Sequence, residues 1–165
     1  MSQATKRLSQ GFTLIEMVVV LAIVAVLVLA AQPLHELALR RTQETALRHA
    51  LREVRTAIDE HRRAVERGVL ATGANKSPFP LDLQSLVAGV AVLSAPGQAP
   101  GESRLYLLRR LPRDPFADPD VPAHESWGLR ASTSPPSAPQ AGSDVFDIHS
   151  KSELRALDGT RYRDW

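Results

Sequence analysis

Cysteine is absent from this sequence of 165 residues. Its absence excludes a disulfide framework, thiolate metal sites and a cysteine nucleophile. Familiar catalytic motifs are missing as well: there is no phosphate-cradling glycine loop, no Gly-x-Ser-x-Gly elbow and no His-Glu-x-x-His helix. The five histidines are scattered without the spacing of metal ligands. The sequence therefore does not indicate an enzyme.

The sequence also lacks the length for several domains. A leader, one membrane helix and one small soluble domain account for all of it. Roughly 95 residues lie beyond the long helix predicted below, and a core built from them alone is modest in size. We therefore expect the soluble domain to bury part of its apolar surface against that helix.

A long apolar run is present near the N-terminus. Residues 12–31 contain only two polar side chains, Thr13 and Glu16, and both lie at the start of the run. As a helix, about 20 residues cover roughly 30 Å, the thickness of the hydrocarbon core of a bilayer. We therefore predict a transmembrane helix over residues 12–32. Glu16 needs an explanation, because an unpaired charge in lipid costs on the order of 3 kcal/mol.

The short leader before this run is basic and contains Lys6 and Arg7. The positive-inside rule keeps such residues in the cytoplasm, so the rest of the chain would lie on the other side of the membrane. The alternative is a secretory signal cut near Ala31. Such a signal has an apolar region of only about 7–15 residues that directly follows its basic residues. The carboxylate of Glu16 interrupts the run on the wrong side for that pattern.

Residues 11–16 read Gly-Phe-Thr-Leu-Ile-Glu, and this junction resembles the leader of type IV pilins and of the pseudopilins of type II secretion systems. The resemblance implies that a prepilin peptidase cuts between Gly11 and Phe12 and N-methylates Phe12. It also implies that Glu16 faces the N-terminal amine of a neighbouring subunit during assembly, so that two charges compensate each other. The alternative is that Glu16 reaches the lipid headgroups from one turn inside the membrane.

Removal of the leader changes the charge balance. The full sequence has a net charge of +2, and loss of Lys6 and Arg7 from its 20 basic residues leaves 18 against 18 acidic ones. The mature chain is therefore balanced, and no nucleic-acid partner is indicated.

Beyond Pro33 the sequence becomes amphipathic, and its apolar residues up to Val65 mostly recur at spacings of three and four. We predict that the helix continues through residues 33–70, because proline can bend a long helix without ending it. Arginines alternate with acidic residues, Glu44 among them, on the remaining faces. These charges fit either a solvated, salt-bridged surface or contacts with neighbouring subunits in a fibre.

Residues 71–165 are expected to form a globular α+β domain with a small antiparallel sheet. Two short helices are predicted: one at 79–87, in which Leu81, Leu83, Leu86 and Val87 cap the long helix, and one at 103–111, where a strand is the alternative. Strands are predicted at 127–130 and 144–150, with a flexible exposed loop at 132–143 between them. A hairpin turn at 158–159 and a closing strand through Tyr162 and Trp165 complete the domain.

The segment Leu111-Pro-Arg-Asp-Pro-Phe116 resembles the Leu-Pro-x-Asp-Pro-Trp motif of the major, G-type pseudopilin. Its two prolines restrict the backbone, and Asp114 can accept hydrogen bonds from nearby amides, which predicts a rigid corner. The family continues with Trp-Gly, whereas Trp127-Gly128 comes later here, so an inserted loop is expected. The absence of cysteine points the same way, since many major pilins close a C-terminal loop with a disulfide.

The resemblance to G-type pseudopilins makes calcium a possible cofactor of this chain. G-type pseudopilins bind the ion through acidic side chains and backbone oxygens in a loop near the C-terminus, and a hard cation prefers such oxygens. Here the corresponding loop offers Glu153 and Asp158, without a closely spaced acidic pair. Asp158 is the weak calcium candidate, and its alternative role is that of a turn residue.

Together the residues and the resemblance predict an α+β, type IV pilin-like fold and a non-enzymatic structural subunit. The resemblance implies a bacterial inner-membrane protein with a cytoplasmic N-terminus and a periplasmic domain. Its expected partners are further copies in a helical homopolymer, minor pseudopilins, the inner-membrane assembly platform, the prepilin peptidase and the lipid bilayer. The alternatives are a pilin of a type IV pilus and a signal-anchored periplasmic enzyme or binding module.

Overall fold

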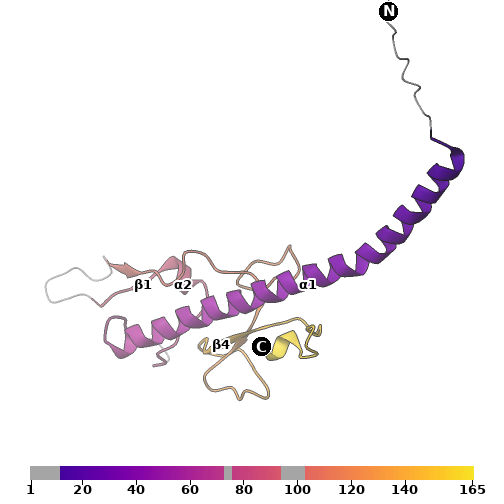
Figure 1. The fold of residues 1–165 in the computed structure, drawn as a ribbon. Helices are drawn as coiled ribbons and strands as arrows, with labels where there is room; N and C mark the ends of the chain where they lie inside the picture. Colours follow the sequence, from indigo (N-terminus) through magenta and orange to yellow (C-terminus); the bar gives the residue numbers. More distant parts are fainter. Residues whose placement is uncertain (1–11, 73–75, 94–102) are drawn as a thin grey trace, which may run out of the picture. The chain divides into compact units, whose positions relative to one another are not determined.

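A computed structural model describes residues 12–72, 76–93 and 103–165 of the chain, without the side chains of residues 30–34. The chain divides into two compact units, residues 1–40 and residues 41–165. Helix α1, Leu14–Glu66, contributes to both units (Figure 1). The predicted continuation of the helix past Pro33 is therefore confirmed.

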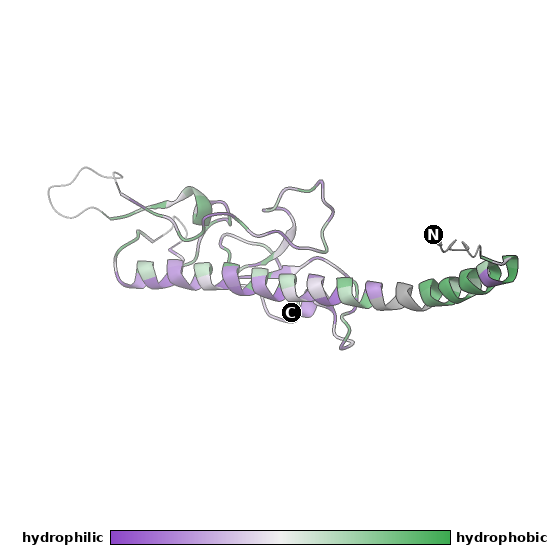
Figure 2. Cartoon of the chain, turned by 45° about the horizontal axis from the view of Figure 1, so that its top comes forward, coloured by the Kyte–Doolittle hydropathy of each residue, from purple (hydrophilic) through white to green (hydrophobic). Residues whose placement is uncertain are grey.

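The described part of the first unit is helical from Leu14 onward and has no buried side chain among those described. Apolar residues dominate the beginning of α1, whereas hydrophilic and hydrophobic residues alternate along its later turns (Figure 2). One helix thus carries two different surface patterns.

A Schellman motif ends α1 in the second unit. The amide of Gly68 donates to the carbonyl of Val65 at 2.9 Å, and the amide of Val69 donates to the carbonyl of Ala64 at 2.8 Å. Gly68 has a φ of 71°, a conformation that costs glycine little because it lacks a Cβ atom. The helix therefore ends at Glu66, four residues before the expected boundary.

The rest of the second unit contains short elements: helix α2 (Ser85–Ala88), strands β1 (Val90–Ala91), β2 (Arg104–Leu105), β3 (Trp127–Arg130) and β4 (Asp147–Ser150), and the 3₁₀ helix η1 (Tyr162–Asp164). Two antiparallel pairs form among the described residues, β1 with β2 and β3 with β4. In the second pair Trp127 lies opposite Ser150 and Leu129 opposite Ile148. The expected α+β architecture, a long N-terminal helix with a small antiparallel sheet, is confirmed.

The core of the second unit lies between one face of α1 and the elements that follow it. Helix positions Leu47, Leu51, Val54 and Ile58 are buried together with Trp127 and Ile148 of the β3–β4 pair and Tyr162 of η1. Their spacings of three and four place these helix residues on one face, as the sequence pattern predicted. The indole of Trp127 is almost fully buried, and its Nε1 donates to the carbonyl of Pro112 at 2.9 Å.

Several local expectations were wrong. Residues 103–111 were expected to be helical, but strand β2 lies there, because Leu105 pairs with Val90 and Arg104 with Ala91. Tyr162 and Trp165 were expected in a closing strand, but Tyr162 begins η1. Leu81 was expected to cap α1 and is 52% exposed, whereas Leu83 and Leu86 are buried in the core.

Other expectations hold with changed boundaries. Strand β3 occupies the expected residues 127–130, and β4 begins at Asp147 instead of Asp144. The loop at 132–143 contains no helix or strand, and the amide of Ala131 donates to the carbonyl of Gln140 across it at 2.9 Å. The turn at Asp158-Gly159 is confirmed by the bridge between Arg155 and Arg161.

Candidate functional site

The first candidate site is the beginning of α1, where Thr13 caps the helix. The hydroxyl oxygen of Thr13 accepts a hydrogen bond from the amide of Glu16 at 3.3 Å, and its carbonyl accepts from the amide of Met17 at 3.2 Å. Thr-x-x-Glu is the spacing of a capping box, in which a hydroxyl satisfies an otherwise free amide of the first turn. Sequence reasoning treated Thr13 only as part of a motif and missed this role, although the spacing was visible.

This cap places Glu16 in the first turn of α1 with an exposed side chain. A carboxylate is favourable there, because the first turn of a helix carries a partial positive charge. Glu16 forms no ion pair with any residue in the described part of the chain. Phe12 lies just before the helix and is 74% exposed, and Gly11 lies outside the described residues.

Apolar side chains surround this part of α1 on all sides. Every large apolar residue from Phe12 to Leu29 is at least 43% exposed. Soluble monomers rarely expose a continuous apolar surface beyond a few hundred Å², and a larger one marks contact with protein or membrane. This segment is therefore a candidate interaction surface.

The described residues contain no helix that combines the length and the apolar character required to cross a bilayer. The transmembrane helix expected over residues 12–32 is thus not confirmed, and the side chains of residues 30–34 lie outside the description.

Residues 6–32 match the prokaryotic N-terminal methylation motif. The match covers the basic leader, the Gly-Phe-Thr-Leu-Ile-Glu junction and the apolar run. It supports a type IV pilin-like protein that is cleaved by a prepilin peptidase and methylated, and it suggests self-assembly and membrane-anchored processing. Pseudopilins and type IV pilus subunits are not distinguished by it. Searches of curated proteins and of solved structures found no significant match.

In the second unit, Glu44 is a structural residue of α1. Only 7% of it is exposed, and its Oε1 accepts hydrogen bonds from the amide of Leu157 at 2.8 Å and from the hydroxyl of Tyr162 at 3.0 Å. The expectation that Glu44 belongs to a solvated or subunit-contact face is therefore wrong. Its partners lie more than a hundred residues later in the sequence, so no local pattern revealed them.

Arg55, which lies later on α1 than Glu44, binds two segments from the end of the chain. Its guanidinium donates to the carboxylate of Asp147 at 2.8 Å, to the carbonyl of Ile148 at 2.9 Å and to the backbone oxygen of Trp165 at 2.7 Å. Hydrogen bonds from a charged donor are about twice as strong as neutral ones. Arg55 thus ties α1 to β4 and to residue 165, a role that sequence reasoning did not assign.

The Leu-Pro-x-Asp-Pro segment forms the expected corner around Asp114. This carboxylate is 1% exposed, accepts from the amide of Phe116 at 2.8 Å and from the hydroxyl of Ser150 at 2.6 Å. The amide of Asp114 itself donates to the hydroxyl of Ser126 at 3.2 Å. The acceptor role predicted for Asp114 is confirmed, and the corner is fixed directly to the end of β4.

A second buried carboxylate, Asp144, holds the beginning and the end of the 132–143 loop. It accepts hydrogen bonds from the hydroxyl of Ser77 and from the amide and hydroxyl of Ser132, the last two at 2.9 and 2.6 Å. Burial raises the pKa of Asp144, but the hydrogen bonds from Ser132 and Ser77 outweigh it and bring the pKa below its ordinary value. Asp144 therefore remains ionised at neutral pH.

The calcium candidate Asp158 acts as the expected turn residue. Its Oδ1 accepts from the amide and the hydroxyl of Thr160 at 2.9 and 2.6 Å, and these bonds lower the pKa of its carboxyl group. Its Oδ2 lies 3.7 Å from a guanidinium nitrogen of Arg48. Across the described ranges no three His, Cys, Asp or Glu side chains are grouped closely enough to hold a metal ion.

Two histidines of this unit have shifted titration. His61 is 5% exposed, its Nδ1 lies 2.9 Å from the carbonyl oxygen of Pro78, and burial lowers its pKa. Burial likewise lowers the pKa of His149 on β4. Both side chains are therefore mainly neutral at neutral pH, and both belong to the packing of the fold.

Proposed function

We propose that the chain is a non-enzymatic pseudopilin subunit of a type II secretion system, which polymerises into a periplasmic pseudopilus for protein export. The observation that carries the proposal is the methylation motif at the start of a helix whose apolar side chains are exposed on every side. A helix of this kind gains its burial from lipid before assembly and from neighbouring helices afterwards.

Four residues carry the proposed processing and assembly. The prepilin peptidase cuts between Gly11 and Phe12 and methylates the new N-terminus. Thr13, the residue directly after Phe12, then caps α1, so the helix starts immediately after the new N-terminus. Glu16, exposed and without an intrachain ion pair in the described residues, is the counter-charge for the amine of a neighbouring subunit.

The choice of a pseudopilin over a pilin of a type IV pilus rests on two features of the second unit. The Leu-Pro-x-Asp-Pro corner resembles that of G-type pseudopilins, and its Asp114 is built into the core. The chain contains no cysteine, so it has no disulfide-closed loop. In the proposed topology the N-terminus lies in the cytoplasm and residues 41–165 lie in the periplasm, where they contact minor pseudopilins and the assembly platform.

Mass spectrometry of the protein purified from its own cells tests the processing. The expected product begins at Phe12 and carries one additional methyl group. A chain that still begins at Met1 in cells containing the peptidase contradicts the proposal.

Substitution of Glu16 tests assembly. Glu16→Ala is expected to leave membrane insertion unchanged and to reduce fibre formation by more than about tenfold, because one charge of each pair is lost. Asp59→Ala is the matched control, since Asp59 is an exposed carboxylate of the same helix in its later part. Normal fibres from Glu16→Ala refute the pairing role.

Deletion of the gene separates the two assemblies. Loss of protein secretion into the medium with intact surface pili supports the pseudopilin, whereas loss of surface pili with normal secretion identifies a type IV pilus subunit.

A further inference from the structure

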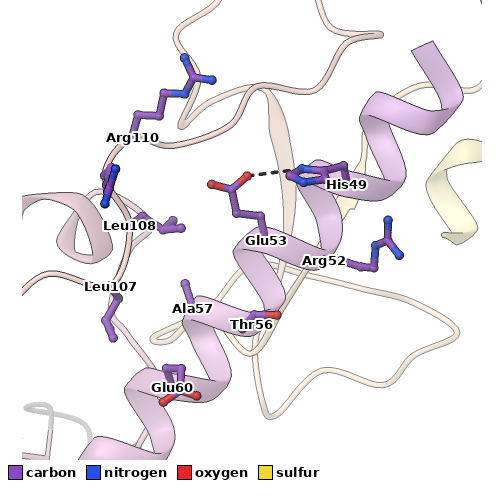
Figure 3. A pocket seen from close by; sticks show the side chains of 10 residues that line it. His49, Arg52, Glu53, Thr56, Ala57, Glu60, Leu107, Leu108 and Arg110 are labelled. Atoms are coloured by element: carbon purple, nitrogen blue, oxygen red, sulfur yellow. Dashed lines mark ion pairs between the residues drawn. The ribbon is translucent and has the colours of Figure 1, made fainter. Parts of the chain in front are cut away.

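A groove beside α1 has the features of a contact surface. It has a volume of about 890 Å³ and lies between the helix turns from His49 to Glu60 and the segment Leu107–Arg110 (Figure 3). Its floor is apolar, because Ala57 and the nearly buried Leu108 line it. The two walls differ in charge: Glu53 and Glu60 line the helix side together with Arg52, whereas Arg110 extends from the opposite segment (Figure 3).

The charges of these walls are largely uncompensated within the chain. Arg109 and Arg110 are exposed, and neither forms an ion pair with a described residue. Among the described residues, the one ion-pair partner of Glu53 is His49 at 3.6 Å, which is charged only when protonated. Glu60, by contrast, is paired with Arg63 at 2.6 Å. An occupant would therefore meet the carboxylate of Glu53 and the guanidinium of Arg52 on the helix side, and the guanidinium groups of Arg109 and Arg110 on the other side.

Residues 36–41 of α1 have the complementary pattern. Leu37 is 43% exposed, Glu36 precedes it, and Arg40 and Arg41 follow one turn later. All three charged side chains are exposed and lack ion pairs with residues that the structure describes. A helix crossing the groove could thus place Leu37 over the floor, Glu36 toward Arg109 and Arg110, and the arginines toward Glu53.

We propose that residues 36–41 of a second copy of this chain occupy the groove formed by α1 and Leu107–Arg110. The inference deepens the proposed function and rests on its premise that the chain self-assembles. The contact joins two different surfaces of the same protein, so each copy offers one groove and one segment, and repetition of the contact extends into a filament. An apolar helix residue held in a groove between complementary charges is a recurring mode of recognition.

Engineered disulfides test this contact directly, because the chain contains no cysteine of its own. In the double variant Leu37→Cys with Ala57→Cys, mild oxidation of assembled fibres is expected to give a ladder of covalent oligomers. Within one helix these positions are about 30 Å apart, so a bond between them joins two copies. The matched control is Leu37→Cys with Asp59→Cys, an exposed position of the same helix that does not line the groove. It is expected to give no ladder.

Exchange of charged residues across the contact is the second test. It tests the groove contact even if the cysteine variants do not assemble. Glu53→Arg is expected to reduce fibre formation more than about tenfold, because arginines then face each other across the contact. Adding Arg41→Glu is expected to restore it, and Asp59→Arg alone is expected to leave it unchanged.

The outcomes distinguish the groove contact from the proposed function. Fibres that give no ladder with Leu37→Cys and Ala57→Cys overturn the groove contact and leave the pseudopilin proposal intact. Failure of Arg41→Glu to restore the fibres of Glu53→Arg also overturns the contact. Absence of fibres from the unmodified chain, with the complete assembly machinery present, refutes the proposed function itself.

Discussion

The two parts of helix α1 differ in what surrounds their apolar side chains. From Leu14 to Leu29 every large apolar side chain is exposed, whereas Leu47, Leu51, Val54 and Ile58 are almost completely buried against the rest of the second unit. Both parts are helical, because a helix satisfies its backbone hydrogen bonds internally and does not depend on its surroundings for them. In the proposed assembly, the first part obtains its apolar burial from other molecules, whereas the second part obtains it from its own chain.

The largest expected effect is the difference in stability between substitution of a buried leucine and substitution of an exposed leucine of α1. Leu47→Ala is expected to lower the free energy of unfolding of the second unit by about 3 kcal/mol, because it leaves a cavity in a packed core. Leu27→Ala, at a position 62% exposed, is expected to change it by less than about 0.5 kcal/mol. Urea unfolding in detergent measures both, since both tryptophans lie in the second unit. Equal effects would show that the two parts are not distinct.

Asp114 and Asp118 offer a comparison within one loop. Asp114→Ala leaves the amide of Phe116 and the hydroxyl of Ser150 without their buried acceptor and is expected to cost about 2–3 kcal/mol. Asp118→Ala removes an exposed bond to the amide of Asp120 and is expected to cost about 0.5 kcal/mol. The same unfolding experiment measures them. A small loss in Asp114→Ala would mean that the corner is held mainly by its prolines.

A buried and an exposed glutamate of α1 allow a further comparison of stability. Glu44→Ala is expected to cost about 1–2 kcal/mol, because the amide of Leu157 and the hydroxyl of Tyr162 lose their shared acceptor. Glu36→Ala, at an exposed position, is expected to leave the unfolding of the second unit within about 0.5 kcal/mol of the parent value. A glutamine at position 44 keeps an acceptor oxygen and should recover most of the loss. If it does not, the charge of Glu44 matters more than its hydrogen bonds.

The smallest expected effect is the pH dependence due to His61. Burial lowers the pKa of folded His61 below its ordinary value of 6.5, so between these two pKa values the unfolded chain binds more protons than the folded one. The stability contributed by neutral His61 is complete above that range and is lost as the pH falls through 6.5 toward the folded-state pKa. The slope due to this one group is at most about 1.4 kcal/mol per pH unit.

Replacement by a side chain that does not titrate checks the assignment. His61→Asn is expected to reduce the slope of unfolding free energy against pH below 6.5, relative to the parent protein and to a variant of the exposed His49. An unchanged slope would place the titrating group elsewhere, with His149 as the next candidate, because burial lowers its pKa in the same direction.

Local sequence patterns predicted the features that local physics determines. The spacing of apolar residues gave the continuous helix and its buried face, the Asp158-Gly159 pair gave the turn, and the prolines around Asp114 gave the corner. The burial of Glu44 and the bonds of Arg55 were not predictable in this way, because their partners are 92 to 118 positions away in the sequence. Strand β2 was missed for a similar reason. The three-residue spacing of Leu105, Leu108 and Leu111 favoured a helix, whereas pairing with β1 makes residues 104 and 105 a strand.

The candidate sites also divide into features that neighbouring residues encode and features that distant segments form together. The junction of Gly11, Phe12 and Glu16 was recognisable because it lies within six consecutive residues, and the methylation motif spans it. The groove beside α1 was not recognisable, because it combines helix residues with the segment Leu107–Arg110 about 50 positions later. A surface built from distant segments requires the fold.

The long sequence separation of the Glu44 and Arg55 bonds has a consequence for how the protein forms. Helix formation takes microseconds or less, whereas a contact between distant segments must wait for a large loop to close. During synthesis α1 is complete nearly a hundred residues before Tyr162 and Trp165 emerge, and its apolar face is then uncovered. Such a state is prone to aggregation. Binding of a chaperone to the nascent chain should therefore be strongest after α1 emerges and should end when the η1 segment docks.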